Sequence, residues 1–353
     1  MGSMFVYNVF LGFGILVVLF SSNWVLVWVM IELSTLVIVA LLSHRLSPRA
    51  VESTSKYFII QAVASVFLLS GVLVRYYLLG EILLFSEYEI FSYGLVMLGL
   101  LVKLAVFPNP FWFVDVVSGL SLFRSVYVIL LSKVVPLYLY VCLSGGLWAF
   151  WFVVVGVSSV VVGSVLGINQ TSVRKVVALS SVSHLGWMVA GFPFLSWFLC
   201  FFVFFGYVLM VIPLVFFGGL FSFNFLVKSK NVYYNPVVVF CVVLSLLSLG
   251  GFPPLLGFFY KWILFYGLVS GGFYLFSGVL VVLSLVSLFF YLQICYSLCS
   301  VYWPELKFSL YGGIFRSFMF SLSNFGLAII SFCSLVLVFG ICCLGPLSFF
   351  WFF

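Results

Sequence analysis

Four ionisable residues lie inside long apolar stretches of this 353-residue sequence. Glu32, Lys103, Lys133 and Lys261 each stand well away from the nearest polar flank. A charged side chain at the centre of a bilayer costs roughly 2.5–3.5 kcal/mol on insertion scales. Packing alone gives no reason for one acid and three lysines at such positions, whereas carrying protons or ions through a membrane requires groups of this kind.

An acid and an amine in apolar surroundings can exchange protons, because burial favours the neutral form of each. Glu32 would ionise only with a cation nearby. A desolvated lysine can release its proton near neutral pH, which an arginine cannot. The alternatives are a neutral Glu32 bonded to a helix neighbour, and lysines that extend to the membrane interface. Interfacial extension suits Lys261, the least central of the three, better than Lys133.

His184 and Lys175 are candidate relay residues in a further apolar stretch. Histidine titrates near neutral pH, so His184 could connect the two halves of the chain through waters held by neighbouring serines. A structural role, in which the His184 ring hydrogen-bonds to neighbours in its own helix, accounts for the residue nearly as well. Lys175, together with Arg174, is better explained as marking a basic membrane face.

Composition defines the elements that must position these residues. The chain is 66% hydrophobic and only 6% charged, whereas soluble domains carry about 25% charged residues. Its apolar stretches reach the roughly 20 residues that a helix needs to span a bilayer, and they do not alternate as barrel strands do. The sequence therefore predicts an all-α polytopic membrane protein.

Polar interruptions divide the chain into eleven predicted spans joined by short loops. Their limits are 4–20, 24–43, 57–79, 89–107, 121–143, 147–167, 174–192, 195–221, 236–269, 272–298 and 321–346. Ten of the 14 Lys and Arg residues fall in the loops that follow even-numbered spans or in the first residues of the span after such a loop. Because basic loops stay on the cytosolic or matrix side, this alternation predicts an N-terminus on that side and a C-terminus opposite.

Two of the predicted spans are interrupted by residues that break helices. Span 4 runs into Pro108 and Pro110, and span 9 contains Gly251, Pro253 and Pro254. Proline removes an amide donor and clashes with the preceding turn. Free backbone groups at membrane depth occur only where protein or water satisfies them.

The two breaks lie five spans apart, and an odd offset reverses the direction of the corresponding helices. This arrangement predicts inverted repeats, as in secondary transporters. The predicted domains are a first five-helix repeat at 1–145, a second and inverted five-helix repeat at 146–300, and a loop with one further transmembrane helix at 301–353.

Several other functions are disfavoured by the sequence. The formal charge of +7 comes from basic residues scattered singly or in pairs, so no nucleic-acid partner is expected. The eight cysteines fall within or beside apolar stretches and form no C-x-x-C pair, so neither a metal nor a haem is expected. There is no phosphate loop, dinucleotide fingerprint or hydrolytic triad. The energy source is therefore expected to be an ion gradient or a partner protein.

Several stretches together resemble a known family. They read Lys56-Tyr57-Phe58…Gln61…Ser65; Asn169-Gln170…Arg174-Lys175…Ser180-Ser181…His184…Gly186-Trp187; and Leu247-Ser248-Leu249…Gly251…Pro253-Pro254-Leu255…Gly257-Phe258…Lys261-Trp262. With the segment around Glu32, they resemble NADH–ubiquinone oxidoreductase chain 2, the family of mitochondrially encoded, antiporter-like membrane subunits of respiratory complex I. The resemblance extends from the second to the tenth span.

The resemblance implies that Glu32, Lys103, Lys133 and Lys261 form a polar axis that translocates protons, driven by quinone reduction elsewhere in the complex. It implies no cofactor in this chain, because NADH, flavin, iron–sulfur clusters and quinone are bound by other subunits. The implied partners are other membrane-arm subunits, neighbouring antiporter-like subunits and phospholipids such as cardiolipin. The implied location is the mitochondrial inner membrane, with the N-terminus on the matrix side and the C-terminus on the intermembrane-space side.

One region departs from the family pattern. The family usually has Lys-Leu-Gly followed by Pro-Phe-His, Trp and Pro. This chain has Lys103-Leu104-Ala105 followed by Pro108-Asn109-Pro110, Trp112 and Val114. The helix break is kept by different residues, and Asp115 stands where the family commonly has glutamate. The missing histidine leaves the proton route between Lys103 and the surface undefined.

Two other functions are compatible with the sequence. A stand-alone cation/proton antiporter would share the fold and the buried lysines, but it would be stable and transport ions as a single purified chain. A structural spacer in a membrane complex would tolerate apolar replacement of all four buried charges.

Overall fold

The computed structural model describes residues 2–44, 47–84, 88–145, 148–220, 236–253 and 255–302. Across these ranges the chain is almost entirely helical, and β-type pairing is limited to an isolated bridge between Asn23 and Leu83. Seven helices in this part of the chain are long and apolar enough to cross a membrane, and four shorter apolar helices accompany them. The prediction of an all-α polytopic membrane protein is confirmed. The predicted span 321–346 and Pro254 lie outside the described residues.

The first half of the chain forms the first five predicted spans. One span begins earlier than predicted, because Ser47 caps its helix by accepting a hydrogen bond from the Ala50 amide at 3.3 Å, and the proline that follows suits a first helical turn. The elements are α1 (Gly2–Phe20), α2 (Trp24–Leu42), α3 (Pro48–Leu79), α4 (Ile90–Leu104), α5 (Phe111–Gly119), α6 (Leu122–Val126), the π-helix η1 (Tyr127–Leu131) and α7 (Ser132–Leu143).

The second half matches predicted spans 6 to 10 to within a few residues. Its elements are α8 (Ala149–Ile168), α9 (Val173–Gly191), the 3₁₀ turn η2 (Phe192–Phe194), α10 (Trp197–Leu220), α11 (Pro236–Gly250), α12 (Leu256–Ser270) and α13 (Tyr274–Tyr302). The boundary between the two repeats, placed at 145, stays a prediction.

Both predicted helix breaks are present. Residues 105–110 separate α4 from α5, and residues 251–255 separate α11 from α12. The residue directly after each broken helix has a left-handed backbone, with φ at +60° for Ala105 and +84° for Gly251. Glycine adopts this conformation freely, whereas a residue with a Cβ atom adopts it at a cost of roughly 1–2 kcal/mol.

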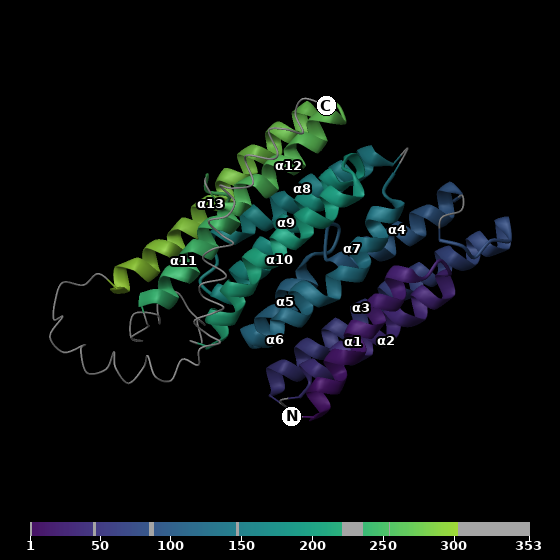
Figure 1. Cartoon of the computed structure of the whole chain (residues 1–353), viewed down its shortest axis with the longest axis horizontal. Helices are drawn as coiled ribbons and strands as arrows, with labels where there is room; N and C mark the ends of the chain where they lie inside the picture. Colours follow the sequence, from purple (N-terminus) through teal and green to yellow (C-terminus); the bar gives the residue numbers. More distant parts are fainter. Residues whose placement is uncertain are drawn as a thin grey trace.

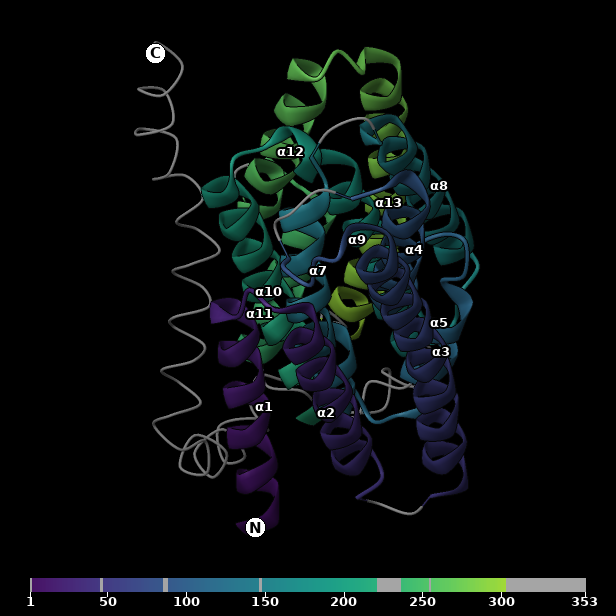
Figure 2. The same ribbon diagram turned by 90° about the vertical axis from the view of Figure 1, so that its right-hand side faces the viewer.

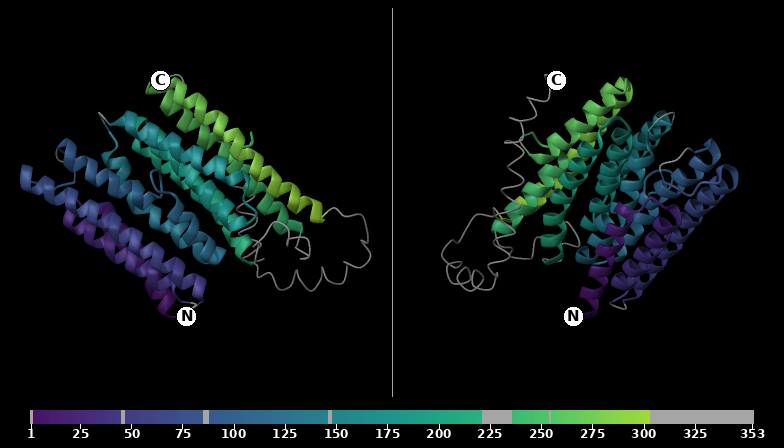
Figure 3. Two further views of the ribbon diagram at one scale, coloured as in Figure 1. Left: turned by 180° about the vertical axis from the view of Figure 1, so that it is seen from behind. Right: turned by 45° about the vertical axis from the view of Figure 1, so that its right-hand side comes forward.

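The helices form a bundle that is ordered across its width. In Figure 1, α1, α2 and α3 lie along one side and α11, α12 and α13 along the other, with α5, α7, α9 and α10 between them. In the view turned by 90° (Figure 2), α1, α2 and α3 face the viewer, and the two further views (Figure 3) show the same order as Figure 1. Helix α9 is the central element, because all residues from Val176 to Gly191 are buried and it packs against α5, α8, α10 and α12.

Close approach of α8 to α9 depends on a glycine. A Cβ atom on Gly163 would lie 2.8 Å from the Leu179 carbonyl oxygen and 2.9 Å from the Ser183 amide nitrogen. Small residues allow membrane helices to approach in this way. The glycine therefore fixes the position of α9, which carries His184.

The basic residues of several loops meet at one end of the bundle. Arg174 donates a hydrogen bond to the Leu120 carbonyl at 2.8 Å, and Arg124 donates to the Leu42 carbonyl at 3.2 Å. Arg174 also lies within electrostatic range of Arg49. The predicted alternation of basic loops is therefore reflected in the packing, while the membrane side that this end faces stays a prediction.

Candidate proton-relay site

Glu32 of α2 and Lys103 of α4 form an ion pair inside the bundle. Lys103 Nζ lies 3.9 Å from Glu32 Oε1, with 1% of the lysine side chain and 25% of the glutamate side chain exposed. Their attraction is on the order of 4 kcal/mol at an effective dielectric constant of 20. Taking each charge out of water costs several kcal/mol. The attraction and the cost of removing the charges from water are similar in size. A small change in the charges around the pair can therefore decide whether it is charged or neutral.

Lys103 stands in the last turn of α4, directly before the first helix break. The last turn of a helix presents carbonyl groups without intrahelical partners and a partial negative charge, both of which favour an ammonium group. Glu32 lies in the middle of the unbroken α2. The ion pair therefore connects a continuous helix to an interrupted one.

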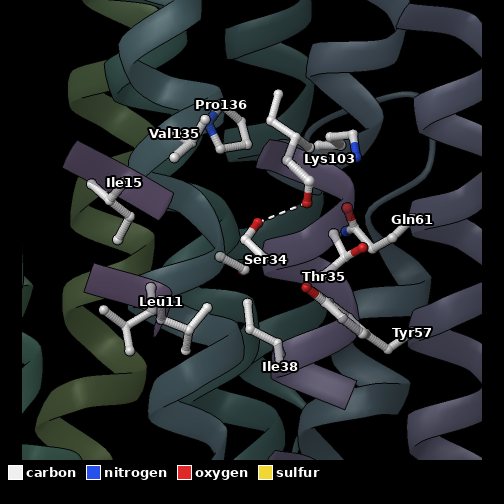
Figure 4. Close-up of a pocket in the computed structure, with 13 residues that line it drawn as sticks. Leu11, Ile15, Ser34, Thr35, Ile38, Tyr57, Gln61, Lys103, Val135 and Pro136 are labelled. Carbon is white, nitrogen blue, oxygen red and sulfur yellow. Dashed lines mark hydrogen bonds between the residues drawn. The ribbon is translucent and has the colours of Figure 1, made fainter. Parts of the chain in front are cut away.

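A small cavity adjoins the ion pair. Its volume is about 20 Å³, enough for about one water molecule. Figure 4 shows that side chains from α1, α2, α3 and α7 surround the space that Lys103 borders. The polar residues of the lining are Ser34, Thr35, Tyr57, Gln61, Lys103 and Ser132.

Lys133 is buried and pairs with an aromatic ring. Its side chain is 1% exposed, and its Nζ atom lies 3.8 Å from the centroid of the Phe113 ring on α5. No hydrogen-bond acceptor reaches the ammonium from the described residues. A cation over the face of a ring gains electrostatic energy from the ring quadrupole. The ring is therefore the contact that stabilises a proton on Lys133.

The helix that carries Lys133 is irregular just before it. The π-helix η1 ends at Leu131, and Pro136 follows inside α7. Single-turn π-helices occur often at functional sites, because they displace side chains from the regular helix surface. Lys133 lies two residues beyond this irregularity, with its ammonium over Phe113 of α5.

Lys261 reaches the second helix break. Its Nζ atom donates a hydrogen bond to the Gly250 carbonyl at 2.8 Å. Gly250 is the last residue of α11, so this carbonyl has no intrahelical partner. A Cβ atom on Gly251 would lie 3.0 Å from Lys261 Nζ. This geometry favours a lysine held at the break over one that extends to the membrane interface.

His184 lies at the same break from the side of α9. It is 2% exposed, and its ring centroid is 5.6 Å from that of Tyr207 and 5.4 Å from that of Tyr260. Tyr260 donates a hydrogen bond to the His184 carbonyl at 3.0 Å. The imidazole also lies beside the Leu249 carbonyl and within electrostatic range of Lys261. The central helix and the second break therefore share one buried polar cluster.

Lys175 is exposed on the first turn of α9. It precedes His184 by nine residues, which is about 13 Å along the helix axis. The structure therefore does not bring Lys175 to the buried residues, and its position agrees with a basic membrane face. The buried candidates fall into three groups, namely Glu32 with Lys103, Lys133 with Phe113, and His184 with Lys261.

Three residues of the site were absent from the sequence-based candidates. Gln61 and Tyr57 carry a detectable signal, since both are polar side chains in or at the end of the third apolar stretch. Phe113 is one of 46 phenylalanines, and nothing in the sequence separates it from the others. Among the described residues, no three His, Cys, Asp or Glu side chains are placed to hold a metal ion.

Residues 21–287 match the family model described as NADH:quinone oxidoreductase/Mrp antiporter, transmembrane. The matched region includes both helix breaks and all four buried charges, and it defines an antiporter-like membrane protein. The chain belongs to the NADH:quinone oxidoreductase/Mrp antiporter family.

Two relatives and one solved structure resemble the chain over most of its length. The chain is 35% identical over 293 residues to NADH-ubiquinone oxidoreductase chain 2 of Patiria pectinifera, covering 83% of this chain and 82% of that protein. It is 30% identical over 299 residues to the protein of the same name from Paracentrotus lividus, covering 84% of each. A chain of respiratory complex I from Thermus thermophilus with bound aureothin has the same fold, with a TM-score of 0.78 at 21% identity, covering 95% of this chain and 77% of that chain.

The second break yields a test with a matched control. Gly251→Ala and Gly272→Ala each place a Cβ atom on a left-handed backbone, with φ of +84° and +81°, at a cost of roughly 1–2 kcal/mol. Only the Cβ atom at 251 reaches Lys261, since Gly272 has nothing within 4 Å. We expect Gly251→Ala to lower proton transport by the assembled complex in membrane vesicles and Gly272→Ala to leave it unchanged. Equal transport by the two variants would contradict a role for the Lys261–Gly250 contact.

The ring beside Lys133 yields a second test. Phe113→Leu removes a cation–π contact worth about 2 kcal/mol in a desolvated site. We expect proton transport in vesicles to fall several-fold. Phe192→Leu removes another buried ring, from η2, and controls for lost packing. A similar loss in both variants would show that Phe113 acts only through the packing of the core.

Proposed function

We propose that this chain translocates protons as a membrane-arm subunit of NADH:ubiquinone oxidoreductase. The observation that carries the proposal is the Glu32–Lys103 ion pair, which lies inside the bundle of membrane-crossing helices at a helix break. The family of the chain and the names of its relatives support it. The chain contributes no redox site in this proposal, because NADH, flavin, iron–sulfur clusters and quinone would be bound by other subunits.

Glu32 and Lys103 act as one unit in this proposal. A quarter of the Glu32 side chain is exposed on the surface of the chain, so a neighbouring subunit can change its charge. When Glu32 is protonated, Lys103 loses its counter-charge, and burial then favours release of the lysine proton. The chemical step is a proton transfer between oxygen and nitrogen atoms, with no covalent intermediate.

Lys133 and Lys261 continue the transfer. Lys133 receives a proton for a limited time, because a ring face stabilises its ammonium less than a carboxylate would. His184 lies between the first half of the chain and the second break, where Lys261 is held by the Gly250 carbonyl. Lys261 exchanges its proton with one side of the membrane.

The remaining features of the proposal concern location and assembly. The chain lies in the mitochondrial inner membrane, with its N-terminus on the matrix side and its C-terminus on the intermembrane-space side, as the basic loops indicate. Residues 1–145 and 146–300 form the two inverted repeats, and 301–353 add a loop and one further transmembrane helix. Other membrane-arm subunits, including neighbouring antiporter-like subunits, and phospholipids such as cardiolipin cover its surface.

A stand-alone cation/proton antiporter is the second candidate function, since the family description also includes Mrp antiporters. Native gel electrophoresis separates the two candidates. A subunit of the oxidoreductase migrates with a very large assembly, whereas an antiporter migrates alone and transports ions as a purified chain in liposomes.

Substitution of Lys103 tests the proposed relay. Lys103→Met removes the ammonium but keeps a side chain of similar length, so we expect fewer protons pumped for each NADH oxidised by the assembled complex. Lys175→Met is the control, because it removes an exposed lysine at the start of α9. The proposal fails if Lys103→Met leaves both quinone reductase activity and proton stoichiometry normal.

A further inference from the structure

Three buried polar atoms with no hydrogen-bond partner among the described residues belong to side chains that line one cavity. They are Lys103 Nζ, Tyr57 Oη and Gln61 Nε2. The three residues are 2%, 0% and 3% exposed. A buried polar group without a partner costs about 1–3 kcal/mol. Three such groups around a single space indicate that the space holds something that hydrogen-bonds to them.

The dimensions of the cavity identify its occupant as water. A volume of about 20 Å³ exceeds the roughly 10–15 Å³ that one water requires, and buried waters typically have two to four polar partners. The separation of 3.9 Å between Lys103 and Glu32 is too long for a hydrogen bond. The ion pair therefore leaves the Lys103 ammonium free to hydrogen-bond to a water in the cavity that it lines.

The cavity lies at the inner end of a polar row on α3. Ser53, Thr54, Tyr57, Gln61 and Ser65 are all buried. Tyr57 follows Thr54 by three residues and Ser53 by four, and Gln61 and Ser65 follow at steps of four, which places the five on one face of the helix. Beyond Lys56, the rest of α3 is largely apolar. The row therefore leads along the helix from its start to the level of the cavity.

The start of this row is at the basic end of the bundle. Glu52 and Lys56 form an exposed ion pair there at 2.7 Å, and Asp115 of α5 lies within electrostatic range of Lys56. The Tyr57 ring is fixed against the ring of Trp112, at 6.1 Å between centroids. Tyr57 thus stands between the charged surface and the cavity, with its hydroxyl group on the cavity side.

We propose that the cavity is a water site liganded by Lys103, Tyr57 and Gln61, and that the polar row of α3 supplies it with protons from the basic face. The inference rests on the proposed relay through Lys103. When the Lys103 amine is neutral, the bound water donates a proton to Nζ and takes one from the next hydroxyl or water along α3. Each oxygen ends the step neutral, and the positive charge moves from the basic face to Lys103.

Two conservative substitutions test the water site. Tyr57→Phe removes one hydroxyl, and Gln61→Leu removes the amide while keeping the approximate volume. We expect each to lower the rate of proton transport by the assembled complex by about 100-fold or more, which is the low end of the range for loss of a positioned proton donor or acceptor. Tyr77→Phe and Gln293→Leu make the same chemical changes on exposed positions of α3 and α13, and we expect normal transport from both.

A second test does not require any variant to fold. It is a structure of the unmodified complex at a resolution that shows water molecules. We expect a water within hydrogen-bond distance of Lys103 Nζ, Tyr57 Oη and Gln61 Nε2. A dry cavity in that structure would overturn the inference. Normal transport by assembled Tyr57→Phe and Gln61→Leu complexes, together with loss in Lys103→Met, would overturn it while leaving the proposed relay intact. Normal transport in Lys103→Met would instead overturn the relay.

Discussion

Both helix breaks expose backbone carbonyl groups within the bundle, and two of the three site lysines lie beside them. Lys103 occupies the last turn of α4, and Lys261 donates to the last carbonyl of α11. A continuous helix satisfies its own carbonyl groups, so it would offer Lys261 no acceptor. Each interruption needs a left-handed residue at its start, and the chain uses Ala105 in one place and Gly251 in the other. The breaks are therefore the constraint from which the rest of the site follows.

The three buried lysines have chemically different partners. Lys103 faces a carboxylate, Lys133 faces an aromatic ring, and Lys261 faces a carbonyl at a helix end. A full negative charge stabilises an ammonium most strongly, while a ring and a carbonyl do so less. A proton bound along this series is therefore held with unequal strength. Of the three partners, only the carboxylate can itself change charge, which is why our proposal makes Glu32 the point where another subunit controls the series.

Much of the fold could be predicted from the sequence, because its determinants are local. The lengths of the apolar stretches predicted the spans, and the proline and glycine residues predicted the helix breaks. The gap between α11 and α12 confirms the second break. The predicted start of the third span was wrong. Polar residues such as Lys56 were assigned to a loop, whereas Ser47 caps a longer helix that includes them. The π-helix before Lys133 has no comparable local signature.

The candidate site was predictable only in part, for a related reason. A charge in an apolar stretch is visible in the sequence, so Glu32, Lys103, Lys133 and Lys261 could be named. Which side chain faces each of them depends on tertiary contacts. Phe113 therefore cannot be distinguished from the other phenylalanines, and the cavity is lined by residues of α1, α2, α3, α4, η1 and α7. In our proposal, the polar row of α3 provides the route to Lys103 in a chain where Asn109 occupies the break region.

A double-mutant cycle on Glu32 and Lys103 tests most directly whether the two residues work as one unit. Glu32→Gln, Lys103→Met and the double variant are compared for protons pumped per NADH oxidised by the assembled complex. If the pair is one unit, the double variant pumps about as well as the worse single variant, because the second substitution removes a group that no longer has its partner. Independent, additive losses from the two substitutions would contradict the account.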